Sequence, residues 1–301
     1  MTLFLIQTLR NSGIRRTDIG LLPCPTVAAG GVSNDNLSHY WIEDDGKPEM
    51  KVKEKKPPYK VLSMATVRKI KPNGYTVVST FSGCGGSCTG YRMAGFRIAW
   101  ANEFVPIAQE SYKANADKDS ILDPRDIRLI KAQDILKAIG IKKGEIDLLD
   151  GSPPCQAFSA AGKREKGWGK EKKYEHGASQ KNEELFYEYI RLLDGLQPRV
   201  FVAENVSGLV KGVAKGFFLE ILEKLKGCGY QVKAKLLDAQ WLGVPQQRQR
   251  IIFIGVRKDL KVSPAFPSPL SYRYSVADAC PDIFQVRKGK GFGEEEWVGA
   301  S

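Results

Sequence analysis

The chain has 301 residues, which is enough for one large α/β domain and a small additional part. Its composition, 42% hydrophobic and 27% charged, is typical of a folded domain, and no apolar run approaches the ~20 residues that span a bilayer, which excludes an integral membrane protein. The formal net charge of +12 favours a polyanionic partner such as a nucleic acid without deciding the matter.

The six cysteines are scattered along the chain without the paired spacing of a disulfide framework. Cys84 and Cys88 are close in sequence, but no second pair supplies the other ligands of a zinc site, so no metal is expected. The arginines near the N-terminus follow the apolar opening residues, which is the reverse of a signal peptide. These features predict a cytoplasmic protein.

Residues 1–74 show little hydrophobic periodicity and are predicted to form an irregular arm. Proline, glycine, asparagine and aspartate are spread through its middle, and a lysine-rich run follows at 51–56. This run either touches a DNA backbone or is a solvated linker, and the sequence does not choose between the two.

From Tyr75 onward, short apolar segments alternate with segments of helical periodicity, which is typical of βαβ units and a parallel sheet. The predicted strands cover 76–81, 97–101, 145–150, 199–204, 231–237 and 250–256. The predicted helices cover 86–93, 106–114, 132–139, 183–193 and 214–226. The fold class is therefore α/β with a doubly wound, mostly parallel sheet, and ligands are expected beyond the carboxyl ends of the strands.

A glycine-rich turn and an acidic residue follow the first two predicted strands. The turn is Phe81–Gly86, and the second strand leads into Glu103. Glycines let a backbone approach a ligand closely, and a carboxylate at this spacing can accept hydrogen bonds from ribose hydroxyls, so this arrangement suits a nucleoside. A further acid, Asp126, either receives the amino group of an adenine or caps a helix.

The third predicted strand leads into a proline-stiffened loop that presents Cys155. A thiol is reactive as the thiolate, which needs an electropositive or hydrogen-bonding environment. The segment that follows, at 162–173, contains three glycines and six cations: Lys163, Arg164, Lys166, Lys170, Lys172 and Lys173. This segment is either a loop that closes over a phosphate backbone or an ordinary exposed loop.

Two further charged motifs lie near the ends of later strands. Glu204 directly follows an apolar strand, where a carboxylate is costly unless it has a partner or a function. Arg248 and Arg250 are two residues apart at the start of the last predicted strand, so they point to one face. Aligned guanidinium groups can bind a carboxylate, a phosphate or a base carbonyl.

In this order and spacing, the Phe-x-Gly-x-Gly-Gly turn, the Pro-Pro-Cys loop, Glu-Asn-Val and Gln-x-Arg-x-Arg resemble the cytosine-C5 DNA methyltransferase family. The resemblance covers roughly residues 75–256. It implies a Rossmann-like methyltransferase fold, S-adenosyl-L-methionine as cofactor and double-stranded DNA as substrate. A cytosine inside a duplex cannot be reached, so the resemblance also implies base flipping.

The same resemblance implies roles for individual residues. Phe81 would stack near the adenine of the cofactor, Glu103 would hold its ribose, and Asp126 would bind the adenine amino group. The full set implied for cofactor binding is Phe81, Ser82, Gly83, Gly85, Gly86, Glu103, Asp126, Ile127 and Pro153.

For catalysis, the resemblance implies that Cys155 is the nucleophile that adds to cytosine. Glu204 would bind N3 and the amino group of the base, and Arg250 would bind O2. Arg248 would support the closed catalytic loop. These four residues are the expected catalytic set.

The resemblance also predicts the domain organisation: an arm at 1–74, a catalytic domain at 75–260, and a linker at 261–301 toward a target-recognition domain that the sequence lacks. A second chain that supplies this domain is one expectation, and a truncated product is the other. Two alternative functions stay open: a catalytically idle remnant that binds cofactor or DNA, and a methyltransferase that acts on tRNA.

Overall fold

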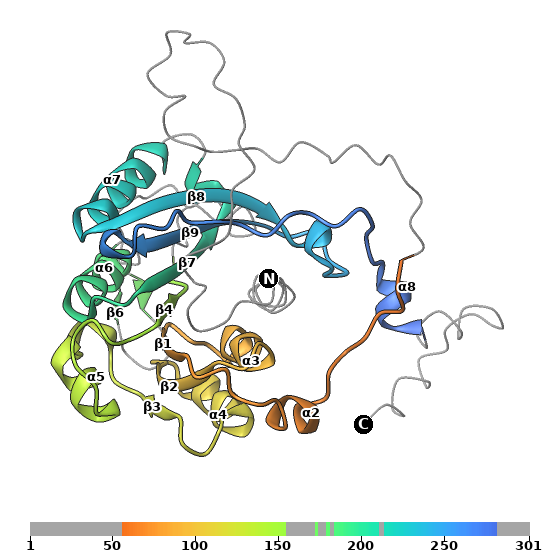
Figure 1. Ribbon diagram of the computed structural model, residues 1–301, viewed down its shortest axis with the longest axis horizontal. Coiled ribbons are helices and arrows are strands. Elements are labelled where there is room, and N and C mark those ends of the chain that lie inside the picture. The colour runs from red at the N-terminus through yellow and green to blue at the C-terminus, as the bar shows by residue number, and fades with distance from the viewer. Residues whose placement is uncertain (1–55, 155–171, 174–178, 181–183, 211–213, 282–301) are drawn as a thin grey trace, which may run out of the picture.

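The computed structural model describes residues 56–154, 172–173, 179–180, 184–210 and 214–281, and a seven-stranded sheet lies at its centre (Figure 1). The order of the strands is β3-β2-β1-β4-β7-β9-β8. Their bounds are β1 Thr76–Thr80, β2 Arg97–Asn102, β3 Ile121–Asp123, β4 Leu148–Gly151, β7 Val200–Val206, β8 Tyr230–Asp238 and β9 Gln249–Arg257. A separate antiparallel pair joins β5 (Lys172–Lys173) to β6 (Ser179–Gln180).

The sheet is mostly parallel, as the sequence predicts. Strands β1, β2, β3, β4 and β7 pair in parallel, whereas β9 runs antiparallel to both β7 and β8. Because β9 is reversed, its first residues lie at the edge where β1, β2, β4 and β7 end. Strands β3 and β8 also end there, so this edge of the sheet gathers six strand ends and the start of β9.

Helices cover both faces of the sheet (Figure 1). The helices α3 (Gly86–Met93) and α4 (Pro106–Asn115) lie on one face. The helices α5 (Ala132–Ile139), α6 (Glu184–Leu196) and α7 (Ala214–Gly227) lie on the other. The shorter helices are α2 (Met64–Arg68), η2 (Ile127–Leu129), η4 (Ser207–Val210), η5 (Ala239–Leu242), η6 (Lys258–Leu260) and α8 (Val276–Ala279).

Alternation along the central strands fills both sides of the core. Val77 and Leu148 belong to the cluster under α3 and α4, whereas their neighbours Val78 and Leu149 belong to the cluster under α5, α6 and α7. All four are almost or fully buried. A side chain of β1 or β4 can therefore be assigned to a face from its position in the strand.

Each predicted strand and helix is confirmed, with ends that differ by a few residues at most. The short elements were not predicted, among them β3, α2, α8 and the pair of β5 with β6. Strand β3 is three residues long and pairs with β2 along one side, and α2 is a five-residue helix capped by Ser63 inside the segment expected to be irregular. Within the described ranges, no helix is both long and apolar enough to cross a membrane.

Candidate active site

The turn Phe81–Gly86 leaves β1 at the carboxyl edge and leads into α3. Its backbone has positive φ at Phe81 (52°), Gly83 (54°) and Gly85 (86°). A Cβ on Gly85 would also lie 3.0 Å from Cδ2 of Tyr112, so glycine is required there for space and for conformation. The turn is consequently a tight backbone loop with little side-chain bulk facing outward at Gly83 and Gly86, where a Cβ would meet nothing within 4 Å.

Glu103 is fixed against this turn. Its Oε2 accepts a hydrogen bond from the Gly83 amide at 2.7 Å, and its Oε1 accepts one from the Val105 amide at 2.8 Å. The side chain is nearly buried, at 9% relative exposure. The structure thus brings together the turn and the acid that the sequence predicted to share a nucleoside site, and each carboxylate oxygen keeps a further lone pair.

Asp126 caps the short helix η2 by accepting a hydrogen bond from the Arg128 amide at 3.0 Å. The Arg128 guanidinium also binds this carboxylate, at 2.6 Å from Nη2 to Oδ2. The capping alternative is therefore confirmed. A role toward adenine stays a prediction, and it would use a carboxylate that Arg128 already orients.

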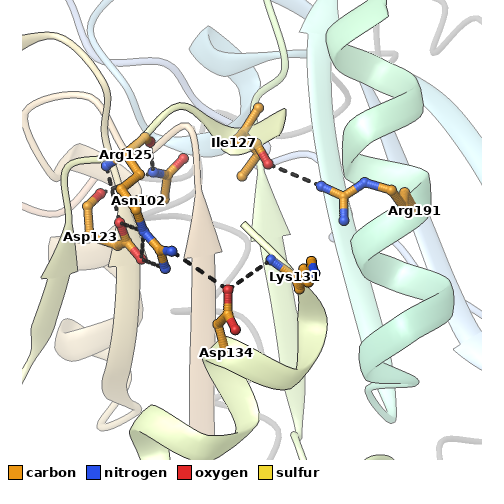
Figure 2. Close-up of polar contacts among 7 residues, drawn as sticks. All are labelled: Asn102, Asp123, Arg125, Ile127, Lys131, Asp134 and Arg191. Atoms are coloured by element: carbon orange, nitrogen blue, oxygen red, sulfur yellow. Dashed lines mark hydrogen bonds and ion pairs between the residues drawn. The ribbon is translucent and has the colours of Figure 1, made fainter. Parts of the chain in front are cut away.

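The loop that carries Asp126 is anchored at both ends (Figure 2). Asn102 donates to the carbonyls of Asp123 and Arg125, at 3.0 and 2.8 Å, and so ties the start of the loop to the end of β2. Arg191 of α6 donates to the carbonyl of Ile127 at 3.0 Å. The loop next to Glu103 is consequently held by a strand on one side and by a helix on the other.

The Arg125 side chain adds a second anchor in the same loop (Figure 2). Its guanidinium binds Asp123 with Nη2 to Oδ2 at 2.7 Å and reaches Asp134 of α5 at 3.6 Å. Asp134 in turn accepts from the backbone amide of Lys131 at 3.3 Å. These contacts connect β3, the loop and α5 in one network.

Cys155 lies outside the described residues, and so does most of the following basic segment. The approach to Cys155 is described up to Pro154. Gly151 at the end of β4 has no space for a Cβ, which would lie 2.5 Å from both Thr80 Oγ1 and Tyr189 Cε2. Asn205 of β7 is buried and donates to the carbonyl of Pro153 at 3.1 Å. The proline loop is thus held between β1, α6 and β7.

Glu204 and Arg250 form an ion pair at the same edge, with 2.8 Å between Oε1 and Nε. Register explains the contact, because Arg250 pairs with Val206 and Glu204 pairs with Ile252, so both side chains lie on one face at diagonal positions. Burial raises the pKa of Glu204, and the charges of Arg250 and Arg248 offset part of that rise. Arg248 itself precedes β9 and is exposed.

Two residues of this edge were not singled out from the sequence. Asn205 lies beside the predicted Glu204, and its bond to Pro153 needs the pairing of β4 with β7 to be known. Asp150 is 4% exposed on β4 and accepts hydrogen bonds from three side chains. A charged residue at the end of an apolar strand was the available signal, as it was for Glu204.

Cys84 of the turn and Cys88 of α3 have separate environments. Cys88 is fully buried in the cluster under α3 and α4, whereas Cys84 is exposed. In the part of the chain that the structure describes, no group of three or more histidine, cysteine or acidic side chains could hold a metal ion.

Comparison with known proteins gives a consistent result. A family model of C-5 cytosine-specific DNA methylases matches residues 75–294. Type II methyltransferase M.NgoPII of Neisseria gonorrhoeae is 38% identical over 195 residues, which cover 65% of this chain and 52% of that protein. Type II methyltransferase M.FnuDI of Fusobacterium nucleatum is 37% identical over 196 residues, covering 65% and 51%.

Among solved structures, a prophage-encoded E. coli protein described as a DNA modification methyltransferase aligns with a TM-score of 0.56 and 27% identity, over 69% of this chain and 54% of that one. The chain spans about half the length of the curated relatives it matches. The match of the family model covers most of the chain and all the predicted motifs, so the chain belongs to the C-5 cytosine-specific DNA methylase family.

Proposed function

We propose that this chain transfers a methyl group from S-adenosyl-L-methionine to C5 of a cytosine in double-stranded DNA, with Cys155 as the nucleophile. The observation that carries the proposal is the Glu204–Arg250 pair, which lies on one face of the sheet beside the proline loop that Asn205 holds. A carboxylic acid and a guanidinium together match the N3, amino and O2 groups along one side of cytosine. Membership of the family supports the same assignment.

The turn at 81–86 and Glu103 fit the nucleoside part of the cofactor. The turn presents backbone without Cβ atoms at Gly83 and Gly86, and Glu103 offers oriented acceptors to ribose hydroxyls. Asp126 and Ile127 would lie at the adenine, with Phe81 stacked near it. When bound, S-adenosyl-L-methionine supplies the methyl group as a sulfonium.

The side chains at this edge would each act on a different atom of the cytosine. The sulfur of Cys155 adds to C6 of the flipped cytosine, which makes C5 nucleophilic, and it leaves again when the C5 proton is removed. Because the pKa of Glu204 is raised, one of its oxygens can donate a proton to N3 while the other accepts from the amino group. Arg250 donates to O2, where negative charge develops as the sulfur adds. Arg248 is the proposed support of the closed loop.

We propose that residues 75–260 form the catalytic domain and that residues 261–301 lead toward a target-recognition domain. Base readout would be the task of that domain, whether a longer form of this chain or a second chain carries it. The curated relatives are about twice as long as the matched region, and this length supports the proposal. The cytoplasm is the proposed location, since the substrate is cellular DNA.

Transfer of tritiated methyl groups from S-adenosyl-L-methionine tests the function, with duplex DNA and tRNA as parallel substrates and with cell extract added to supply a partner chain. Cys155→Ser should abolish incorporation into DNA. Cys280→Ser is the matched control, because Cys280 is an exposed thiol outside the site. Incorporation into tRNA alone would replace the proposed substrate, and full activity of Cys155→Ser would refute the proposed mechanism.

A further inference from the structure

The buried carboxylate of Asp150 is not among the groups proposed above to contact the cofactor or the base. It lies at the end of β4, five residues before Cys155, and Ser79 of β1 is its partner in the strand register. Its Oδ2 accepts hydrogen bonds from Ser79 at 3.2 Å and from Ser87 at 2.9 Å, and its Oδ1 accepts one from Tyr91 at 2.9 Å. All the donors are hydroxyl groups, and the side chain is almost fully buried.

These contacts reach both ends of the cofactor turn. Ser87 follows the turn directly, in the first part of α3. On the other side, Ser82 lies inside the turn and its hydroxyl lies 3.0 Å from the Ser79 oxygen, which in turn donates to Asp150. The Asp150 carboxylate therefore accepts from Ser87 after the turn and is linked through Ser79 to Ser82 inside it, whose hydroxyl also lies 3.1 Å from the Ser79 carbonyl oxygen.

A buried carboxylate at this position lowers the stability of the folded protein when it is ionised. Burial raises the pKa of Asp150 to about 6, although hydrogen bonds from Ser87, Tyr91 and Ser79 lower it, and the negative charge of Glu204 adds to the rise. The ionised group is thus held at a cost to stability near neutral pH. A neutral amide of the same shape would avoid that cost, so the charge itself points to a function.

We propose that Asp150 is a positioning residue whose ionised carboxylate fixes the turn at 81–86 against the strand that leads into the nucleophile loop. Because an ionised carboxylate only accepts, every hydroxyl around it points its hydrogen inward, and Ser82 and Ser87 are held in one arrangement. A protonated acid must itself donate, so one of these hydroxyl groups loses its acceptor and the turn loosens. This role deepens the proposed function and rests on it.

The groups that face Asp150 set how this behaviour depends on pH. Tyr91 and Cys88 face it from α3, Tyr189 from α6, and Glu204 from β7, where Arg250 pairs with Glu204. Burial raises the pKa of both tyrosines and of the thiol, so these three stay neutral from pH 5 to 8. Asp150, with Glu204 beside it, is the group expected to titrate there.

Amide hydrogen exchange of the protein without cofactor tests the positioning role directly. The reporters are the amides of Gly83 and Gly85, which donate to Glu103 and to the Ser82 carbonyl. At pH 7.5, Asp150→Asn should lower their protection about 10-fold. In the wild type, protection should fall by a similar factor between pH 7.5 and pH 5, whereas the variant should show no such fall.

Asp147→Asn is the matched control. Asp147 directly precedes β4 at the opposite edge of the sheet, where it accepts from the Thr76 amide and binds Arg199. Its substitution should leave the protection of Gly83 and Gly85 unchanged. Ser87→Ala is the second variant in case Asp150→Asn does not fold, and it should lower the same protection by a smaller factor.

Calorimetric titration with S-adenosyl-L-methionine then separates this inference from the proposed function. The dissociation constant should rise about 10-fold in Asp150→Asn at pH 7.5 and stay unchanged in Asp147→Asn. Wild-type protein that binds no cofactor, with the turn still loosened in Asp150→Asn, would overturn the function and keep the positioning role. Equal protection and equal affinity in wild type and Asp150→Asn would overturn the positioning role.

Discussion

The ion pair between Glu204 and Arg250 joins two residues that are far apart in sequence at the point where β7 ends and β9 begins. Each partner keeps the other oriented, and neither is fully exposed, so water does not screen the contact completely. The pair therefore presents a carboxyl group and a guanidinium in a fixed arrangement before any base is bound. Preorganisation of this kind is what a flipped base requires.

At this scale the first prediction concerns Glu204→Gln. The amide cannot share a proton with N3 of cytosine, and it leaves Arg250 without its partner. We expect methyl transfer to DNA to fall about 100- to 1000-fold. The measurement is tritium incorporation at saturating cofactor and DNA. Glu223→Gln is the control, because Glu223 is exposed on α7 on the far face, and a similar loss in that variant would contradict the assignment.

The second prediction concerns the stability of Asp150→Asn. The pKa of Asp150 is raised from 3.8 to about 6, so the folded protein favours the protonated form of this group. The contribution of Asp150 to the free energy of unfolding is therefore fully present below pH 4 and is lost as the pH rises through 6. The loss is about 3 kcal/mol. Relative to wild type, Asp150→Asn should gain free energy of unfolding across this range and keep the gain at pH 7.5.

Urea unfolding at a series of pH values from 4 to 8 measures this gain as the difference between variant and wild type, in which the other titrating groups cancel. Asp147→Asn should show no gain at any pH, because that carboxylate accepts from a backbone amide and from Arg199. A difference between Asp150→Asn and wild type that does not vary with pH would mean that Asp150 is not the titrating group.

At the scale of elements, hydrophobic periodicity predicted the strands and helices whose formation depends on local sequence. The segments for β1, β2, β4, β7, β8 and β9 are apolar runs bounded by turns, and the intervening helices have amphipathic spacing, so their existence follows from the pattern. Strand β3 could not be predicted, because three residues with partial exposure carry no pattern and depend on pairing with β2. Helix α2 buries only Val67 and is equally weak in sequence.

The site was predictable to the same extent. Residues in the last part of a strand or directly after it, such as Glu204 and Glu103, could be assigned to the carboxyl edge from topology alone. Contacts across strands could not: the pairing of Glu204 with Arg250 depends on the antiparallel register of β7 and β9, and the bond from Asn205 to Pro153 depends on β4 lying beside β7. Asp126 is a third case, because the sequence fitted both a helix cap and a ligand contact. The structure shows the cap, in which Asp126 accepts from the Arg128 amide and pairs with the Arg128 guanidinium.

The third prediction tests the packing between two strands. Gly255 of β9 pairs with Phe201 of β7, and a Cβ on Gly255 would overlap the Phe201 ring. Because this ring is fully buried and cannot move freely, Gly255→Ala should lower the free energy of unfolding by about 1 to 3 kcal/mol. Gly216→Ala in α7 is the control, since a Cβ there meets nothing within 4 Å and helix propensity favours alanine by about 1 kcal/mol. Urea unfolding should give shifts of opposite sign, and a neutral Gly255→Ala would contradict the packing.

At the scale of the whole molecule, the two edges of the sheet present different charged groups. The carboxyl edge presents the exposed Arg248, whose backbone amide donates to Asp238, and the ion pair of Glu204 with Arg250. At the amino edge, acids and bases neutralise each other, as Asp147 binds Arg199 and Arg257 binds Asp259. The proposed base-binding pair of Glu204 and Arg250 lies at the carboxyl edge, so in a chain with a formal charge of +12 this is the face on which a DNA backbone is expected.

The fourth prediction follows from this asymmetry. Each phosphate neutralised by a protein cation adds about 0.9 to the slope of log affinity against log salt concentration. If Arg248 contacts a phosphate, Arg248→Ala should weaken duplex binding and reduce that slope by about 0.9. Lys258 is exposed in η6 at the amino edge, so Lys258→Ala removes the same charge without removing a contact and should leave the slope unchanged. Fluorescence anisotropy with one duplex at about 50 to 200 mM salt measures the slope for both variants. Equal slopes for Arg248→Ala and Lys258→Ala would contradict the prediction, because net charge alone would then explain the binding.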